Sequence, residues 1–297
     1  MDLTPETFIA INKVWTAIYQ EALRDLPTWH KRFITQVTRM VMTNIYTFTV
    51  KRGGMTEWIG DRTMQNLISR KIELTIREWQ SSIEFEKKEI KYDQIGNRKA
   101  AVEGLAMDKI YHEIDLVVDW LLNGHNASGY NGYDEKPFFN AAHPIAASAK
   151  TFTNYYDDLD LDAEGLYAAR QGMRLVQGDD GRSLSIKPVV LWHSAPLEGK
   201  AEAVIKKQLL SGGESNLDYQ RFELLAIDEL GDVLAWGLLD PNKPMGPLLH
   251  HIGDSTDPRM LRVAGDLHKT GIWGFDQDDN MGGLWWQTIC KAIAPSD

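Results

Sequence analysis

The sequence predicts an α+β protein, and three patterns along the chain support this fold class. Residues 92–123 carry apolar side chains at the spacing of one helix face, among them Val102, Ile110 and Val117. Residues 44–50 and 71–76 instead alternate apolar with polar side chains, which is typical of half-buried strands. From residue 222 onward, short apolar runs bounded by turn residues predict further strands. No internal repeat, low-complexity tract or long linker divides the chain.

The composition is that of a globular protein and excludes several classes of function. Hydrophobic residues make up 43% and charged residues 25% of the 297 positions, enough for a sizeable core. The formal net charge of -10 argues against a basic face that neutralises nucleic-acid phosphates. Cys290 is the only cysteine, which excludes an intramolecular disulfide and a cysteine-rich metal site. No apolar run reaches the roughly 20 residues that span a bilayer, and the first residues lack a signal-peptide pattern. We therefore expect a soluble, unsecreted protein.

The N-terminal segment predicts an amphipathic helix. Residues 4–6 (Thr-Pro-Glu) supply a helix cap, a proline at the first helical position and an acid in the first turn. Helical spacing then continues as far as Pro27. The apolar residues on this face are Phe8, Ile11, Trp15 and Ile18. One interpretation is a helix that packs on its own domain.

Residues 44–90 predict a long two-stranded ribbon. The first strand covers residues 44–50, and the second begins near Lys71. After Ser81 the apolar positions change parity, as a bulge or a new strand requires. Between the strands lies a glycine-containing block, residues 53–62, expected at the tip with Trp58 and Ile59 exposed. Because a two-stranded ribbon cannot bury that much apolar surface alone, we expect a neighbouring copy to cover it.

The remaining segments predict a loop-rich stretch followed by mixed helices and strands. Gly124 ends the long helix, and residues 124–156 are rich in Gly, Asn, Tyr and Pro. Asp162 is a predicted N-cap. We predict helices at 163–176 and 197–210, a buried strand at 187–192, and strands at 222–227, 233–239, 260–264 and 282–293.

Two blocks of sequence resemble a known family. Residues 57–63 (Glu-Trp-Ile-Gly-Asp-Arg-Thr) and residues 138–144 (Phe-Phe-Asn-Ala-Ala-His-Pro) are similar to the major head subunit of Mu-like bacteriophages. The resemblance covers most of the chain in the order of elements, with residue detail concentrated in these blocks. It implies a Hong Kong 97-type phage capsid fold, with an N-terminal arm, an extended β-hairpin loop, a peripheral domain with a spine helix, and an axial domain.

The resemblance implies a division of the chain along these lines. The N-terminal arm would be residues 1–43, and residues 44–90 would be the extended hairpin loop and a peripheral-domain strand. The spine helix of the peripheral domain would follow at 91–124. The axial domain would be residues 125–250, and residues 251–297 would return to the peripheral domain. The N-terminal helix would then lie on an adjacent subunit.

The function implied by the resemblance is structural. Copies would form hexamers and pentamers in a closed icosahedral shell that encloses double-stranded DNA without sequence-specific binding, in the virion and, before assembly, in the host cytoplasm. Scaffold and portal proteins would be separate chains, and no membrane, cofactor, metal or catalytic residue is expected. A bacterial compartment shell of the same fold is an alternative. The expected subunit-interface residues are Glu57, Trp58, Ile59, Asp61, Arg62, Phe8 and Trp15.

A soluble hydrolase is the alternative from a different class, with a site around His143, His193 and Ser194. No Gly-x-Ser-x-Gly elbow surrounds Ser194, and His143 is more simply a hydrogen-bonded loop histidine. The pair His112-Glu113 begins like a zinc-protease helix, but Leu116 stands where the second histidine belongs.

Two further clusters are candidate metal ligands. We expect His250 and His251, with Asp254 and Asp257, to lie in a solvated loop, because adjacent histidines on a strand point to opposite faces. Residues 276–280 resemble part of a calcium loop without its closing glutamate, and we expect an acidic surface turn.

Overall fold

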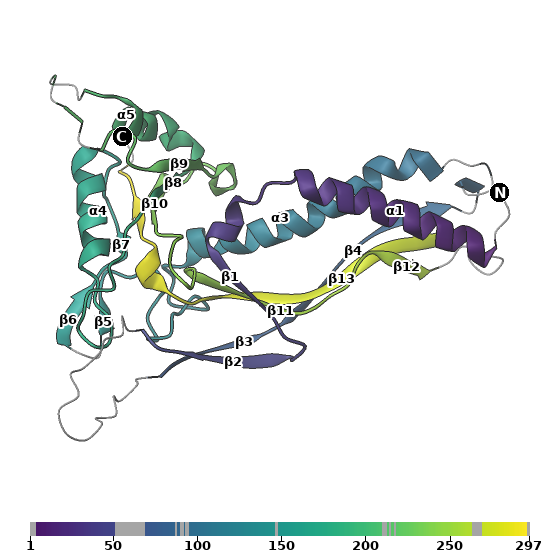
Figure 1. Cartoon of the computed structure of the whole chain (residues 1–297), viewed down its shortest axis with the longest axis horizontal. Helices are drawn as coiled ribbons and strands as arrows, with labels where there is room; N and C mark the ends of the chain where they lie inside the picture. The colour runs from purple at the N-terminus through teal and green to yellow at the C-terminus, as the bar shows by residue number, and fades with distance from the viewer. Residues whose placement is uncertain are drawn as a thin grey trace, which may run out of the picture.

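The computed structural model consists of an elongated half and a compact half (Figure 1). It describes residues 4–50, 69–86, 88, 89, 92, 95–145, 148–209, 213, 215, 216, 218–262 and 269–295. No helix within these ranges is both long enough and apolar enough to cross a membrane. Helices and strands are mixed through the chain, as the α+β prediction requires.

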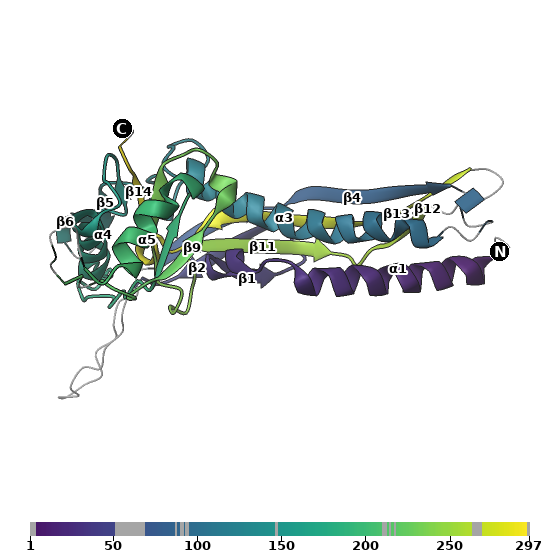
Figure 2. The same ribbon diagram turned by 90° about the horizontal axis from the view of Figure 1, so that it is seen from above.

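The elongated half is built on a sheet whose central strand is β13 (Thr270–Gly283). One edge of β13 pairs with β4 (Arg77–Glu86), and the other pairs with β11 (Leu248–Ser255) and β12 (Arg259–Arg262). The parallel strand β1 (Ile34–Thr38) lies outside β11. Helices α1 (Pro5–Asp25) and α3 (Lys99–Asn123) run along this sheet (Figure 2). Short 3₁₀ turns precede β1 and α3, at Trp29–Arg32 (η1) and Ile95–Arg98 (η2).

Helix α1 begins where its capping signal predicts and packs on its own chain. The Thr4 hydroxyl accepts a hydrogen bond from the Thr7 amide, as an N-cap does. Phe8 and Trp15 are buried in a second apolar cluster of the molecule, where the Trp15 ring meets Phe85 and Trp273 edge-on. Within the subunit both are therefore core residues, and the interface role expected for them stays a prediction.

The compact half holds a second sheet and two helices. Its strand order is β7 (Tyr155–Tyr156), β14 (Lys291–Ile293), β10 (Ala235–Leu239), β8 (Val190–His193) and β9 (Glu223–Ala226). Helices α4 (Ala163–Leu175) and α5 (Glu198–Lys206) flank it, with the hairpin β5 (His143–Ile145) and β6 (Ser148–Phe152) nearby (Figure 1). The 3₁₀ turns of this half are η3 (Ala195–Leu197), η4 (Asp228–Leu230) and η5 (Trp286–Thr288). The last segment thus runs through both sheets, β13 in the first and β14 in the second.

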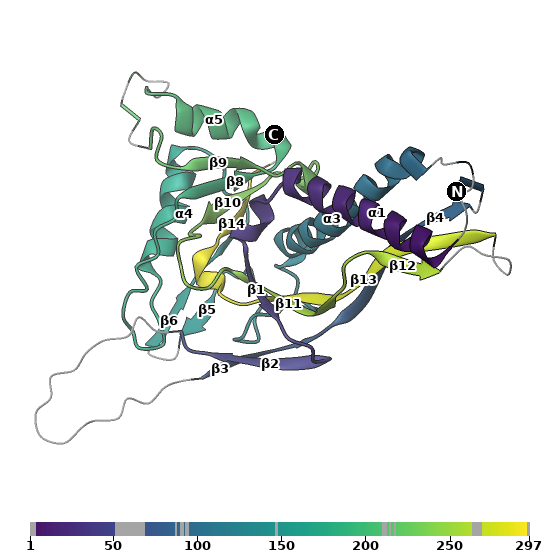
Figure 3. The ribbon, with the colours of Figure 1, turned by 45° about the vertical axis from the view of Figure 1, so that its right-hand side comes forward.

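A two-stranded ribbon, β2 (Thr43–Phe48) paired with β3 (Arg70–Thr75), projects beneath both halves (Figure 3). Its inner face packs on its own chain: Tyr46 meets His251, Phe48 meets Tyr133, and Leu74 belongs to the main core. We call the paired strands β2 and β3 the root of the ribbon. The expectation that only a neighbouring copy covers the ribbon is wrong for this root. The tip block, residues 53–62, lies outside the described residues.

Most predicted elements are present, with corrected boundaries. The long helix starts at Lys99 and not at residue 92, and α5 ends at Lys206, short of residue 210. A separate strand, β4, does account for the change of parity, but it begins at Arg77, after a break at Ile76, and not after Ser81. This strand leaves the ribbon and pairs with β13.

The sequence prediction differs most from the structure in two segments near the C-terminus, residues 250–257 and 276–280. His250 and His251 lie in the buried strand β11, not in a solvated loop. Residues 276–280 are the middle of β13, not a surface turn, and Asp279 is fully buried. Both expectations failed because the buried charges have partners that lie elsewhere in the chain.

Candidate functional site

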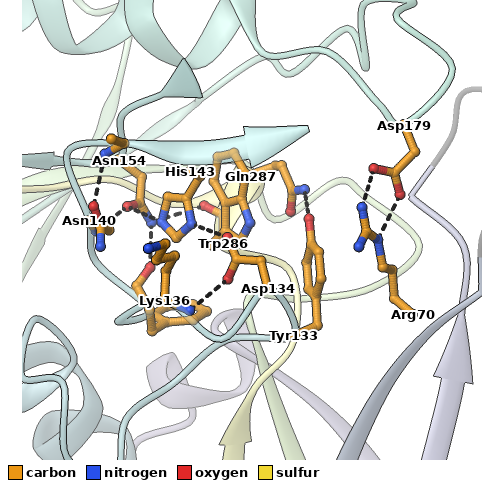
Figure 4. A network of polar contacts seen from close by, with 12 residues as sticks. Arg70, Tyr133, Asp134, Lys136, Asn140, His143, Asn154, Asp179, Trp286 and Gln287 are labelled. Atoms are coloured by element: carbon orange, nitrogen blue, oxygen red, sulfur yellow. Dashed lines mark hydrogen bonds and ion pairs between the residues drawn. The ribbon is translucent and has the colours of Figure 1, made fainter. Parts of the chain in front are cut away.

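The root of the ribbon is held by a polar network that joins it to the compact half of the molecule (Figure 4). Its first part is a two-pronged ion pair: Nε and Nη2 of Arg70 lie 3.0 and 2.6 Å from the two carboxylate oxygens of Asp179. This hydrogen bond is the main reason that the pKa of the Arg70 guanidinium is raised. Asp179 also donates its amide to the Val50 carbonyl at 2.7 Å. A single turn therefore binds the chain just after β2, at Val50, and at the start of β3, at Arg70.

The turn that carries Asp179 allows this close approach because of its glycines. A Cβ on Gly178 would lie 2.8 Å from the Val50 carbonyl oxygen, so a side chain there would displace the ribbon. Gly181 closes the turn with φ of 71°, a conformation that favours glycine. The residues Gly-Asp-Asp-Gly at 178–181 are typical of a turn, but nothing in the sequence shows that the aspartate at 179 pairs with an arginine 109 positions away.

Tyr133 is the second contact between the ribbon and the compact half. Its ring meets Phe48 edge-on at 5.4 Å, and the Arg70 guanidinium lies 5.4 Å from the ring centroid. The Tyr133 hydroxyl accepts a hydrogen bond from Gln287 at 2.5 Å. Burial is the main cause of the strongly raised pKa of Tyr133, so its hydroxyl stays neutral.

His143 lies at the end of this network with an acceptor opposite each ring nitrogen (Figure 4). Nδ1 is 2.6 Å from the Asp134 carboxylate, and Nε2 is 3.1 Å from Oδ1 of Asn154. The Asn154 amide nitrogen donates to the carbonyls of Phe138 and Trp286, so its oxygen must face the histidine. Nε2 of His143 therefore donates to the Asn154 oxygen, while Nδ1 faces the Asp134 carboxylate.

The surroundings of His143 suit a cation. Its ring stacks on the Trp286 indole, with centroids 4.0 Å apart and planes 10° from parallel. Asp134, its hydrogen-bond partner, is the residue next to Tyr133, so His143 is connected to the ribbon contact through adjacent residues of one segment. The predicted hydrogen bonds of His143 are present, but the residue lies at the start of strand β5 and not in a loop.

A second buried charge cluster lies where α3 crosses the first sheet. Asp279 accepts hydrogen bonds from Nε2 of His112 and Nε2 of His250, each at 2.9 Å. Burial raises the pKa of Asp279, but these hydrogen bonds and the His112 charge lower it by more, and the net pKa is far below its usual range. His30 pairs similarly with Glu113 at 3.1 Å. No group of three His, Cys, Asp or Glu side chains suited to a metal occurs in the described part of the chain.

The residues of the hydrolase alternative do not form a catalytic arrangement. Nδ1 of His193 faces the Ser194 main-chain carbonyl at 3.0 Å, and the buried Ser194 hydroxyl has no hydrogen-bond partner among the residues that the structure describes. Both nitrogens of His143 are already engaged by Asp134 and Asn154. A nucleophile needs a base within hydrogen-bond reach, and the described contacts give Ser194 none.

The predicted interface residues are largely outside this network. Glu57, Trp58, Ile59, Asp61 and Arg62 lie outside the described residues. The residues that sequence reasoning missed are the ones that fix the root of the ribbon: Arg70, Asp179, Tyr133, Asp134, Asn154 and Gln287.

Comparison with known sequences finds phage head proteins. A sequence model of the family described as "Mu-like prophage major head subunit gpT" matches residues 8–160 and 152–230. The FluMu prophage major head subunit of Haemophilus influenzae is 25% identical over 162 residues, covering 53% of this chain and 52% of that protein. The major capsid protein of Escherichia phage Mu is 21% identical over 145 residues, 49% of this chain and 47% of that one. The matches thus span about half the length of these relatives.

Comparison with solved structures shows the fold. A procapsid chain of bacteriophage JBD30 superposes with a TM-score of 0.59 at 16% identity, covering 99% of this chain and 77% of that one. A virus-like particle from Pyrococcus furiosus gives a TM-score of 0.52 at 11% identity, covering 94% of this chain and 98% of that one. The expected phage capsid fold is confirmed by these likenesses.

Proposed function

This chain belongs to the family of Mu-like prophage major head subunits, and we propose that it forms the icosahedral shell of a phage head around double-stranded DNA. The observation that carries the proposal is the family match, which extends from residue 8 to residue 230. The fold of the whole chain supports it, because related folds form the procapsid of bacteriophage JBD30.

The mechanism that we propose is assembly by many weak contacts. Copies associate into hexamers and pentamers, and the ribbon of each extends from a root fixed by Arg70, Asp179 and Tyr133. A fixed root limits the directions in which the chain leaves β2 and β3, which lowers the entropy lost on association with a neighbour. The tip residues Glu57, Trp58, Ile59, Asp61 and Arg62 remain the proposed contacts, with scaffold and portal proteins as separate chains. The net charge of -10 suits a wall that does not adhere to DNA.

The proposal divides the chain as the family resemblance implies, with an arm at 1–43, the loop at 44–90, a spine helix at 91–124, an axial domain at 125–250 and a return at 251–297. We propose that the protein acts in the virion, after assembly in the host cytoplasm, without a catalytic step.

Purified protein tests this function. Sedimentation and negative-stain microscopy should show rings or closed shells, whereas a discrete small oligomer under all assembly conditions would contradict the proposal. The fold likeness to a virus-like particle supports a compartment shell as the second candidate. Particles from infected or induced cells separate the two, because a phage head contains DNA and a compartment contains a protein cargo.

A further inference from the structure

We propose that an exposed apolar turn of this chain, residues 39–42, inserts into a pocket beside α3 of a second copy. The inference rests on the proposed shell function and adds to it a pair of complementary surfaces. We call residues 39–42, between β1 and β2, the apolar turn. We call the cavity between β3, α3 and β13 the elbow pocket.

The apolar turn is unusually exposed for its composition. Met40, Val41 and Met42 follow one another, with 80, 43 and 72% of their surface accessible. Consecutive exposed apolar residues typically mark an interaction site, since isolated ones are common but runs are not. Methionine is also suited to such a contact, because its flexible side chain fills irregular cavities.

The apolar turn is held firmly although it projects. The Arg39 amide donates to the Ile252 carbonyl at 2.8 Å, and the Met42 carbonyl accepts from the Ile76 amide at 3.0 Å. The Arg39 carbonyl accepts from Val41 at 2.8 Å and lies 3.1 Å from Nε2 of His251. A turn fixed in this way loses little conformational entropy when it binds.

The elbow pocket has a volume of about 420 Å³, which is within the usual range for a binding cavity. Apolar side chains that line it are Ile72, Leu74, Leu116, Trp120 and Met281. Charged and polar groups stand among them, namely Glu73, Arg77, Asp119 and Asn280. An apolar lining with a few polar groups suits an apolar protein segment that carries one charge at its edge.

The charges of the two surfaces are complementary. Burial first and Asp119 next raise the pKa of Tyr130, whereas Arg77 lowers it, so charges of both signs face this part of the pocket. Glu73 is exposed and has no hydrogen bond or ion pair within the described residues, which leaves the pocket net negative. Arg39, at the start of the apolar turn, is also exposed, and its guanidinium has no hydrogen bond or ion pair within the described residues.

A second copy is the occupant because every copy carries both surfaces. The turn is not among the residues that line the pocket of its own chain, and its hydrogen bonds to Ile252 and Ile76 hold it in place. In a shell made of one chain, a turn of one subunit that enters the pocket of the next would repeat around the assembly.

A set of variants in the full-length chain tests the contact, with assembled particles counted by sedimentation and microscopy. The doubly substituted Met40→Asp, Met42→Asp chain should assemble roughly tenfold less or worse, while its circular dichroism and melting temperature stay those of wild type. Leu175→Asp is the matched control, since Leu175 is 59% exposed on α4, away from both surfaces, and it should assemble normally.

A charge exchange gives the sharper result. Arg39→Glu and Glu73→Arg should each impair assembly, and the chain that carries both should regain it, because the ion pair is restored with opposite polarity. Normal assembly of the methionine variant, or no recovery in the double charge variant, would overturn the inference. Failure of the wild-type chain to assemble at all would instead contradict the proposed shell function, so the two failures are distinguishable.

Discussion

At the scale of single residues, the ion pair between Arg70 and Asp179 fixes the root of the ribbon. The Asp179 side chain is only 7% exposed, and Arg70 presents two N–H groups to it. Removing one member of such a pair leaves the other charge partly buried without its partner. The pair thus fixes the orientation of the ribbon and also stabilises the folded subunit.

Asp179→Asn should lower the free energy of unfolding by about 1–3 kcal/mol, because it loses the charge-assisted bonds while preserving the shape. Thermal melting measures the loss, and limited proteolysis should cut within residues 51–68 faster than in wild type. Glu223→Gln is the control, since its pair with Arg32 is exposed and should contribute less than about 1 kcal/mol. Equal effects of the two substitutions would show that the pair of Arg70 and Asp179 stabilises the ribbon root no more than an exposed ion pair does.

His143 provides a second prediction at this scale. Because an acceptor faces each ring nitrogen, we expect nitrogen-detected NMR near neutral pH to show an N–H group on both nitrogens of this ring. His143→Gln carries both of its donors on a single nitrogen, so it cannot face Asp134 and Asn154 from opposite sides as the ring does, and it should destabilise the protein by about 1–3 kcal/mol. A ring with only one N–H group in the NMR spectrum would contradict this expectation.

At the scale of elements, helix α1 stabilises the elongated half by burying aromatic side chains. Trp15 contacts Phe85 of β4 and Trp273 of β13, so the helix joins strands that are far apart in sequence. Ile9, on the opposite face, is 70% exposed. The same helix therefore offers one face to the core and another to solvent or to a neighbour.

Trp15→Ala should cost about 3–5 kcal/mol of stability in the unassembled subunit, because a large buried ring leaves a cavity. Ile9→Ala, at the exposed position, should change the stability of the subunit by less than about 0.5 kcal/mol. Chemical denaturation measures both. If Trp15→Ala left the subunit stable and prevented assembly only, Trp15 would be an interface residue rather than a core residue.

A row of carboxylates crosses the first sheet and makes its stability depend on pH. Asp278 of β13 lies directly opposite Glu78 of β4 and Asp254 of β11. Burial first, and then repulsion from Glu78 and Asp254, raises the pKa of Asp278 above its ordinary value. A carboxyl group whose pKa is raised on folding destabilises the fold where it is ionised, and this cost disappears as the pH falls through the raised pKa.

Asp278→Asn should therefore raise the melting temperature at neutral pH and make no difference in acid, where Asp278 is already protonated. Asp232→Asn, in an exposed turn, is the control and should change little at either pH. The test is a melting-temperature series from pH 7 down to about pH 3. A destabilised Asp278→Asn protein at neutral pH would show that the carboxylate has a favourable partner.

The sequence predicts local elements well because their signals are local. Thr4 and Asp162 cap helices where expected, and Gly124 ends the long helix. Strand β11 and the first part of β13 could not be predicted, because buried strands seldom contain titratable residues such as His250 and Asp279. These side chains are acceptable only since they pair with each other, and no local pattern shows a partner that is 29 positions away.

At the scale of the whole molecule, two halves and a ribbon form a subunit that leaves some large apolar side chains exposed, among them Ile9, Met40 and Met42. The sequence resemblance predicts the family and fold, and both are confirmed. It does not predict the ribbon root, whose Arg70 and Asp179 come from distant segments. The interface residues predicted at the tip remain untested, because residues 51–68 lie outside the described structure.

The most direct test of the account is a cryo-electron microscopy reconstruction of particles assembled from the purified chain. The account predicts a closed icosahedral shell in which residues 51–68 of each subunit lie against a neighbouring copy. A population of monomers or small oligomers, with that segment folded back on its own chain, would contradict it.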